Sequence, residues 1–92
     1  MPAALRTGRM RKTLRTSEHA ELVALLKEER RRGGLTQQDL AARLGAPQSF
    51  VAKYEGGERR LDLVEFLAIA RAIDADPVEL FARLLKIVGA KS

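Results

Sequence analysis

The sequence predicts one small all-α domain of five helices preceded by a basic arm. Apolar residues recur at spacings of three and four, as on one face of a helix. Capping residues followed by carboxylates mark several helix starts, and glycines stand where helices should end. The 92 residues suffice for a single domain. We expect a flexible arm over residues 1–17, a folded domain over 18–88 and a short tail over 89–92.

The net charge of +5 lies in the arm. Of the 17 basic residues, five stand in residues 1–17, where there is no acidic residue. The remaining 12 basic residues are balanced by 12 acidic ones. A neutral domain with a cationic arm favours local contact with a polyanion. The basic residues of the arm are Arg6, Arg9, Arg11, Lys12 and Arg15.

The first helix is expected to follow Ser17, a good capping residue, and to end at Gly33-Gly34. Glu18 and Glu21 favour its positive end. Its inner stripe consists of Leu22, Leu25 and Leu26. Its last turn carries three basic residues, which suit either the negative end of a helix or contact with phosphate: Arg30, Arg31 and Arg32.

Residues 36–55 predict two short helices joined by a tight turn. Thr36 can cap the first of them, with Asp39 three residues on as in a capping box. Its buried face is expected to contain Leu40, Ala41 and Leu44. Gly45 suits a left-handed helix end, and Pro47 suits the first position of the next helix. With Val51 and Tyr54 on the inner face of the second helix, this pattern is a helix-turn-helix.

The outward face of the second helix carries small or amide-bearing residues and one cation, with no carboxylate: Gln48, Ser49, Ala52 and Lys53. An amide can pair in bidentate fashion with adenine, and Ser or Lys can reach other base edges or phosphates. An ordinary solvated helix face is the alternative for an isolated helix pair.

The run from Leu35 to Arg60 resembles the lambda-repressor-like (Cro or XRE class) helix-turn-helix regulators. The matching residues are Gln37, Ala41, Gly45, Gln48-Ser49, Val51 and the exit Glu55-Gly56-Gly57. The similarity extends over about residues 18–84. Phe50 departs from the class, which often has a small polar residue there. It can contact a thymine methyl group or pack beside Tyr54, and we favour packing.

This resemblance implies that the second helix lies in a major groove, where Gln48 and Ser49 read bases. It also implies that Gln37 contacts the backbone and braces Gln48. Glu55 would be repelled by DNA, so we expect it to turn inward, toward backbone amides or an arginine. The expected DNA-binding residues are Gln37, Gln38, Gln48, Ser49, Phe50, Lys53, Arg59 and Arg60, with Arg6, Arg9, Arg11 and Lys12 of the arm.

Two further helices follow the exit loop. Asp62 and Glu65 form a box at the start of the fourth helix, whose inner face should contain Leu63, Phe66, Leu67, Ala70 and Ile73. The fifth helix is expected to start at Asp76-Pro77 and to end at Gly89. Its apolar residues span about 180°, wider than the roughly 100° of a core-facing stripe. Either the helix lies deep in the domain, or a second subunit covers it. We favour a homodimer through Phe81, Leu84, Ile87 and Val88.

Several functions are not expected. The absence of cysteine excludes disulfides and thiolate metal sites, and a single histidine, His19, cannot build a metal centre and should lie on the surface. We expect no cofactor. We also expect that the protein is not an enzyme, because its carboxylates have no His or Cys partner for catalysis. No apolar run is long enough for a membrane span, so we expect a cytoplasmic protein.

The sequence therefore predicts a sequence-specific regulator of transcription that binds double-stranded DNA as a homodimer on a pseudo-palindromic operator. The class that it resembles suggests a repressor, and the sequence itself leaves repression and activation open. An antitoxin or another protein-interaction module built on the same fold is the alternative. In that case the partner would be a toxin or another regulator.

Overall fold

The computed structural model describes residues 17–91, with side chains for 17–89. The helices are α2 (Ser17–Arg32), α3 (Gln37–Leu44), α4 (Gln48–Glu55), α5 (Leu63–Ala72) and α6 (Pro77–Lys91), and these residues contain no strand. The prediction of an all-α fold with five helices is therefore confirmed. The arm, with the predicted DNA contacts Arg6, Arg9, Arg11 and Lys12, lies outside the described residues.

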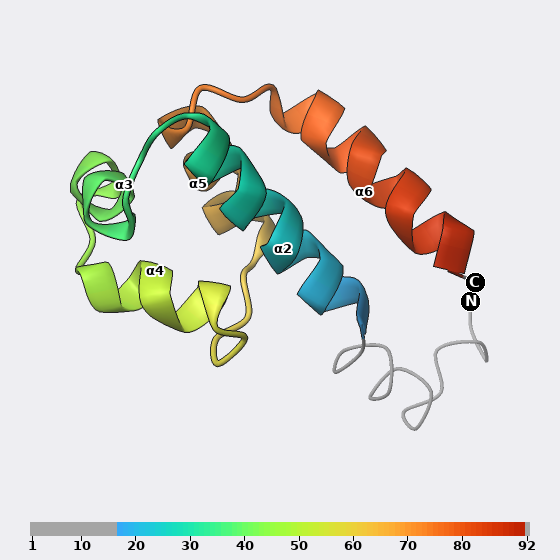
Figure 1. The fold of residues 1–92 in the computed structure, drawn as a ribbon, viewed down its shortest axis with the longest axis horizontal. Coiled ribbons are helices and arrows are strands. Elements are labelled where there is room, and N and C mark those ends of the chain that lie inside the picture. The colour runs from blue at the N-terminus through green and yellow to red at the C-terminus, as the bar shows by residue number, and fades with distance from the viewer. Residues whose placement is uncertain (1–16, 92) are drawn as a thin grey trace.

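Helix α2 runs through the middle of the fold, with α3 and α4 at one end and α6 alongside it (Figure 1). Helix α3 packs against both α4 and α5, and α5 packs against α6. Every helix contributes at least one fully buried side chain to a single core, and these are Leu26, Leu40, Val51, Tyr54, Ile69 and Leu80. The core fixes the helix-turn-helix of α3 and α4 against α2.

The helix starts follow the local signals of the sequence. The Thr36 hydroxyl accepts from the amide of Asp39 at 3.0 Å, and the Asp39 carboxylate accepts from the amide of Thr36 at 2.9 Å. These bonds to Thr36 lower the pKa of Asp39. Asp62 and Glu65 form the same reciprocal box at α5. Both capping boxes satisfy amides that a helix start leaves unpaired.

The turn between α3 and α4 requires glycine. Gly45 has φ 68° and ψ 32°, the left-handed conformation that side-chain-bearing residues avoid. The amide of Ala46 reaches back to the carbonyl of Ala41 at 3.0 Å, as in a Schellman motif. This geometry ends α3 and directs the chain into α4, as predicted.

Three predicted boundaries need correction. Ser17 is the first residue of α2 rather than its cap, and Pro47 is the N-cap of α4 rather than its first residue. Helix α6 does not end at Gly89 but continues to Lys91. Gly89 lacks the positive φ of a helix-ending glycine, and a glycine inside a helix costs only about 1 kcal/mol.

The predicted inner faces are largely correct, with one error and two omissions. Leu63 is 67% exposed, because it is the first residue of α5 and lies beyond the edge of the core. Val23 and Ile69 are buried although the sequence pattern did not single them out.

Tyr54 is fully buried, and its hydroxyl has no hydrogen-bond partner in the described part of the chain. Burial raises the pKa of this phenol. The ring therefore stabilises the core, while the buried hydroxyl without a partner costs about 1–3 kcal/mol.

Candidate nucleic-acid interface

Helix α4 lies at the edge of the fold, with one face in the core and the other open (Figure 1). Val51 and Tyr54 are fully buried. The outward residues are all exposed, as predicted: Gln48, Ser49, Ala52 and Lys53. This face carries amide, hydroxyl and ammonium groups around one small residue, so its chemistry fits the floor and walls of a DNA groove.

The start of α4 carries no side-chain cap. Its N-cap residue is Pro47, which makes no capping hydrogen bond, and no acidic residue stands in the first turn. The amide of Phe50 donates to the carbonyl of Pro47 at 3.0 Å, and no side chain caps this positive helix end, where a phosphate is favoured.

Gln48 is braced by the preceding helix. Its Nε2 donates to Oε1 of Gln37 at 3.3 Å, and Nε2 of Gln37 donates to Oε1 of Glu55 at 3.0 Å. Gln37 is half-buried, whereas Gln38 beside it is exposed. The predicted brace between Gln37 and Gln48 is present, and the predicted inward turn of Glu55 is confirmed.

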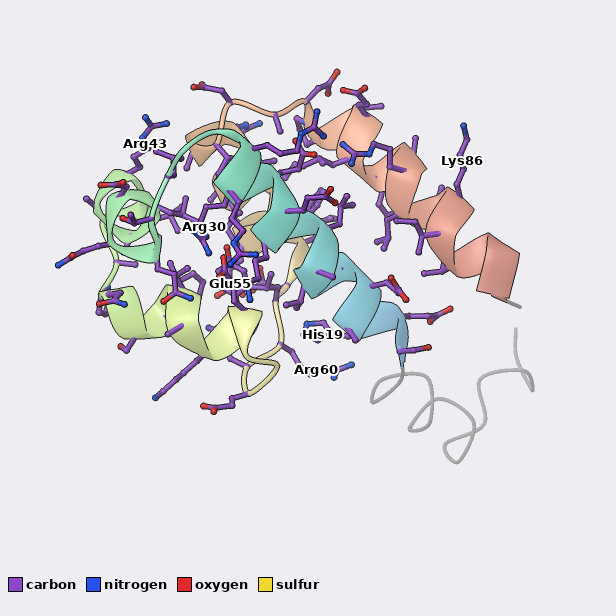
Figure 2. All side chains as sticks on the ribbon, in the orientation of Figure 1. His19, Arg30, Arg43, Glu55, Arg60 and Lys86 are labelled. Carbon is purple, nitrogen blue, oxygen red and sulfur yellow. The ribbon has the colours of Figure 1, made fainter. Side chains whose placement is uncertain are left out.

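Arg30 is the partner that the sequence pattern missed. Its Nε and Nη2 donate to the two carboxylate oxygens of Glu55 at 2.7 and 2.9 Å, and its Nη1 donates to the carbonyl of Leu35 at 2.6 Å. The side chains of Arg30 and Glu55 are only 8% and 2% exposed. Figure 2 shows the two pointing toward one another between α2 and α4. The hydrogen bonds from Arg30 to Glu55 raise the pKa of Arg30.

Arg30 stands in the last turn of α2, as predicted, but it is buried in an ion pair, so its interpretation as a phosphate contact is wrong. The signal that could have found it was the expectation that Glu55 needs an inward arginine. Arg31 and Arg32, the other two arginines of the run, are exposed.

The exit loop places Arg59 over an aromatic ring. The guanidinium carbon lies 4.8 Å from the ring centre of Phe50, which contacts Tyr54 edge-on at 5.4 Å. Arg59 also forms a two-point ion pair with Glu65 at 2.9 and 2.8 Å. This pair lowers the pKa of Glu65 and raises that of Arg59. Phe50 thus packs beside Tyr54 as expected, and Arg59 is already paired before any DNA contact.

His19 does not lie freely on the surface. It is half-buried at the start of α2, and its Nε2 accepts from the amide of Leu61 at 3.4 Å. Burial, and then the charge of Arg60, lowers the pKa of His19. Figure 2 places His19 and Arg60 at the same end of α2, so the histidine helps to hold the end of the exit loop.

Large apolar side chains are also exposed at the start of α5 and on α6. They are Leu63, Val64, Val78, Phe81 and Leu85, at 49–75% exposure. A groove of about 190 Å³ connects the start of α5 with α6 and is lined by Leu63, Phe81 and their neighbours. Of the predicted dimer residues, Leu84 packs against the core of its own chain, and Ile87 and Val88 are half-buried. Phe81 alone of the four is exposed.

Within residues 17–91, no helix is both long enough and apolar enough to cross a membrane. The same residues contain no group of carboxylate or imidazole side chains that could hold a metal ion.

A helix-turn-helix whose second helix exposes amide and ammonium groups is typical of DNA-binding regulators. A family model described as a helix-turn-helix domain matches residues 21–87. An XRE-family like protein from Pseudomonas syringae pv. tomato str. DC3000 is 46% identical, over 85% of this chain and 95% of that one, with a TM-score of 0.78. The chain belongs to the XRE family of helix-turn-helix regulators.

Restriction-modification controller proteins share this fold. C.AhdI from Aeromonas hydrophila is 35% identical over 71% of this chain and 98% of that one, with a TM-score of 0.65. The C.Esp1396I tetramer in complex with its natural 35 base-pair operator is 22% identical over 77% of this chain and 93% of that one, with a TM-score of 0.71. None of the curated proteins matches this chain.

Proposed function

We propose that this protein is a sequence-specific regulator of transcription that binds double-stranded DNA as a homodimer. The observation that carries the proposal is the open face of α4, on which an uncapped helix start and a braced Gln48 stand beside Ser49 and Lys53. The XRE-family fold supports it. With double-stranded DNA as the proposed target, the proposed place of action is the cytoplasm.

In this proposal α4 enters the major groove with its N-terminal end foremost. Gln48 and Ser49 contact base edges there, and Lys53, one turn on, contacts guanine or a phosphate. Gln37 and Gln38 contact the backbone from the start of α3, and Arg60 does so from the exit loop. Arg59 has to share its charge between Glu65 and a phosphate. The function is one of binding rather than catalysis.

The apolar surface supports a homodimer. Exposed apolar side chains at the start of α5 and along α6 are joined by the groove that Leu63 and Phe81 line. Large contiguous apolar patches are rare on monomers and mark contact surfaces. We propose Phe81 and Leu85 as its centre, with Val64 and Val78 beside them. Two-fold symmetry then requires a pseudo-palindromic operator with half-sites about 34 Å apart, one helical turn.

Repression is the proposed outcome of binding, because occupying an operator is enough to exclude a polymerase, whereas activation requires an additional protein contact. The same apolar surface would serve an antitoxin that binds a partner protein. Copurification of a stoichiometric partner seated on α6, with DNA binding unchanged, would favour that second function.

Selection of bound sites from random duplex DNA tests the proposal. The wild type should select one pseudo-palindromic site, and Gln48→Ala should cost about 1–3 kcal/mol on that site and relax the choice at one base position. Lys53→Ala should weaken binding, while Lys86→Ala, on the outer side of α6 in Figure 2, serves as the matched control and should not. Recovery of random sequence from the wild type would contradict the proposed function.

A further inference from the structure

The hydrogen bonds that lead from α2 to Gln48 have a direction, and a buried carboxylate imposes it. An ionised carboxylate can only accept hydrogen bonds. Glu55 therefore requires Gln37 to turn its NH₂ group inward, at 3.0 Å. The amide oxygen of Gln37 then faces outward, and Gln48 must meet it with an N–H, at 3.3 Å. Each amide in the chain has only one orientation that satisfies its neighbour.

The buried end of this series of hydrogen bonds, at Arg30 and Glu55, is rigid. Arg30 holds both oxygens of Glu55, at 2.7 and 2.9 Å, and is itself tied to the carbonyl of Leu35 at 2.6 Å. With 2% of its side chain exposed, Glu55 has no solvent into which it could rotate. The buried end of the chain is thus fixed in position as well as in charge.

The open end of the chain is the amide of Gln48. One of its hydrogens is used on Gln37, which leaves one N–H and the oxygen at the exposed edge. One donor beside one acceptor complements adenine, which presents N7 as an acceptor and its N6 amino group as a donor. Guanine presents two acceptors, N7 and O6, so the oxygen of a fixed amide opposes O6.

We propose that Glu55 is a positioning residue for base recognition: held by Arg30, it fixes the amide of Gln48 through Gln37, so that α4 prefers adenine to guanine. The inference rests on the proposed function and adds the base that is preferred and the residue that determines the preference. Without the carboxylate, Gln37 can turn its amide around, Gln48 can follow, and the discrimination between the two purines falls.

The test compares base preferences in duplex libraries for the wild type and the double variant Arg30→Met/Glu55→Met. The double variant removes both buried charges together, so no unpaired ion remains, and it keeps Gln37 and Gln48. The position to score is the one that Gln48→Ala relaxes. There the preference for adenine over guanine should fall at least about fivefold, the lower end of what one bidentate contact contributes. Preferences at the other positions should not change, which a general loss of folding could not produce.

Two further variants complete the design. Gln37→Met removes the two hydrogen bonds that link Glu55 to Gln48 but leaves the ion pair of Arg30 and Glu55. It therefore tests the inference even if the double variant does not fold. Glu29→Gln is the matched control, since Glu29 also accepts from two arginines but has no bond to Gln37. Thermal unfolding identifies the folded variants. Full adenine preference in either folded test variant, or the same loss in Glu29→Gln, overturns the inference while leaving DNA binding intact. A wild type that selects no site overturns the proposed function as well.

Discussion

The buried ion pair between Arg30 and Glu55 should make the two residues strongly interdependent for stability. In Glu55→Gln the shape is kept, but Arg30 loses its counter-ion while only 8% of its side chain is exposed. Leaving a buried charge without its partner costs about 3–5 kcal/mol. Arg30→Met should cost about the same, because Glu55 then keeps only its bond from Gln37.

The double variant Arg30→Met/Glu55→Met should be far less destabilised than the sum of the single ones. It leaves no buried charge, and replacement of a buried ion pair by apolar residues is often neutral within about 1 kcal/mol or stabilising. The pair should therefore show a coupling energy of several kcal/mol, more than the roughly 0.5–3 kcal/mol usual for residues in contact.

Urea and thermal unfolding of the four proteins measure this coupling. In a domain of this size about 1 kcal/mol corresponds to roughly 4–8 °C, so each single variant should melt at least about 12 °C below the wild type. Arg32→Met is the control. Arg32 is 65% exposed and pairs with Glu29, so its loss should cost no more than about 0.5 kcal/mol. Single variants that lose less than about 1 kcal/mol, or a double variant that loses their sum, would refute this reasoning.

Leu85→Glu should convert a dimer to a monomer that still melts cooperatively, while Lys86→Glu, the adjacent control, should leave the mass found by light scattering unchanged; a wild-type monomer on DNA would exclude the dimer. Stability should fall in acid, because the pKa values of Asp39 and Glu65 are lower in the folded than in the unfolded chain. The stability that they contribute is present above the unfolded values near about 4 and is lost as the pH falls through the folded ones. In Asp39→Asn/Glu65→Gln the free energy of unfolding, measured with urea at each pH, should fall less steeply in acid. An unchanged fall would contradict the role given to these two carboxylates. Deletion of residues 1–15 should reduce the slope of log K for DNA binding against log salt concentration by about 2–3 per subunit if two to four arm cations contact phosphates. Equal slopes would show that the arm takes no part.

Local signals in the sequence were sufficient for the helices and the turn. The capping residues of α3 and α5 lie three positions from the carboxylates that complete them, and Gly45 has a conformation that is defined within its own turn. Such features depend on near neighbours, so a linear pattern contains them. The outward face of α4 was predictable for the same reason, since the helical period separates Gln48 and Lys53 from Tyr54.

The features that were missed depend on distant partners. Arg30 stands four residues after Leu26, so the helical period places it on the inner stripe of α2, but nothing local identifies its partner Glu55, which is 25 positions away. The helical period also cannot separate an apolar residue of the core from one that faces solvent. That is why Leu63 was assigned to the interior.

The hydrogen bonds that lead from the buried Arg30 to the exposed Gln48 restrict how the protein can diverge after gene duplication. A change at Glu55 alters folding before it alters binding, because that side chain is 2% exposed and held by an arginine. Gln48, at the outer end, is exposed and makes one 3.3 Å bond, so it can be exchanged with little loss of stability. On the proposed function, two daughter copies can therefore separate their targets through residues 48 and 49 with little loss of stability. Because a change in one member of the inner pair is costly and a change in both is not, Arg30 and Glu55 should be kept or replaced together in each lineage.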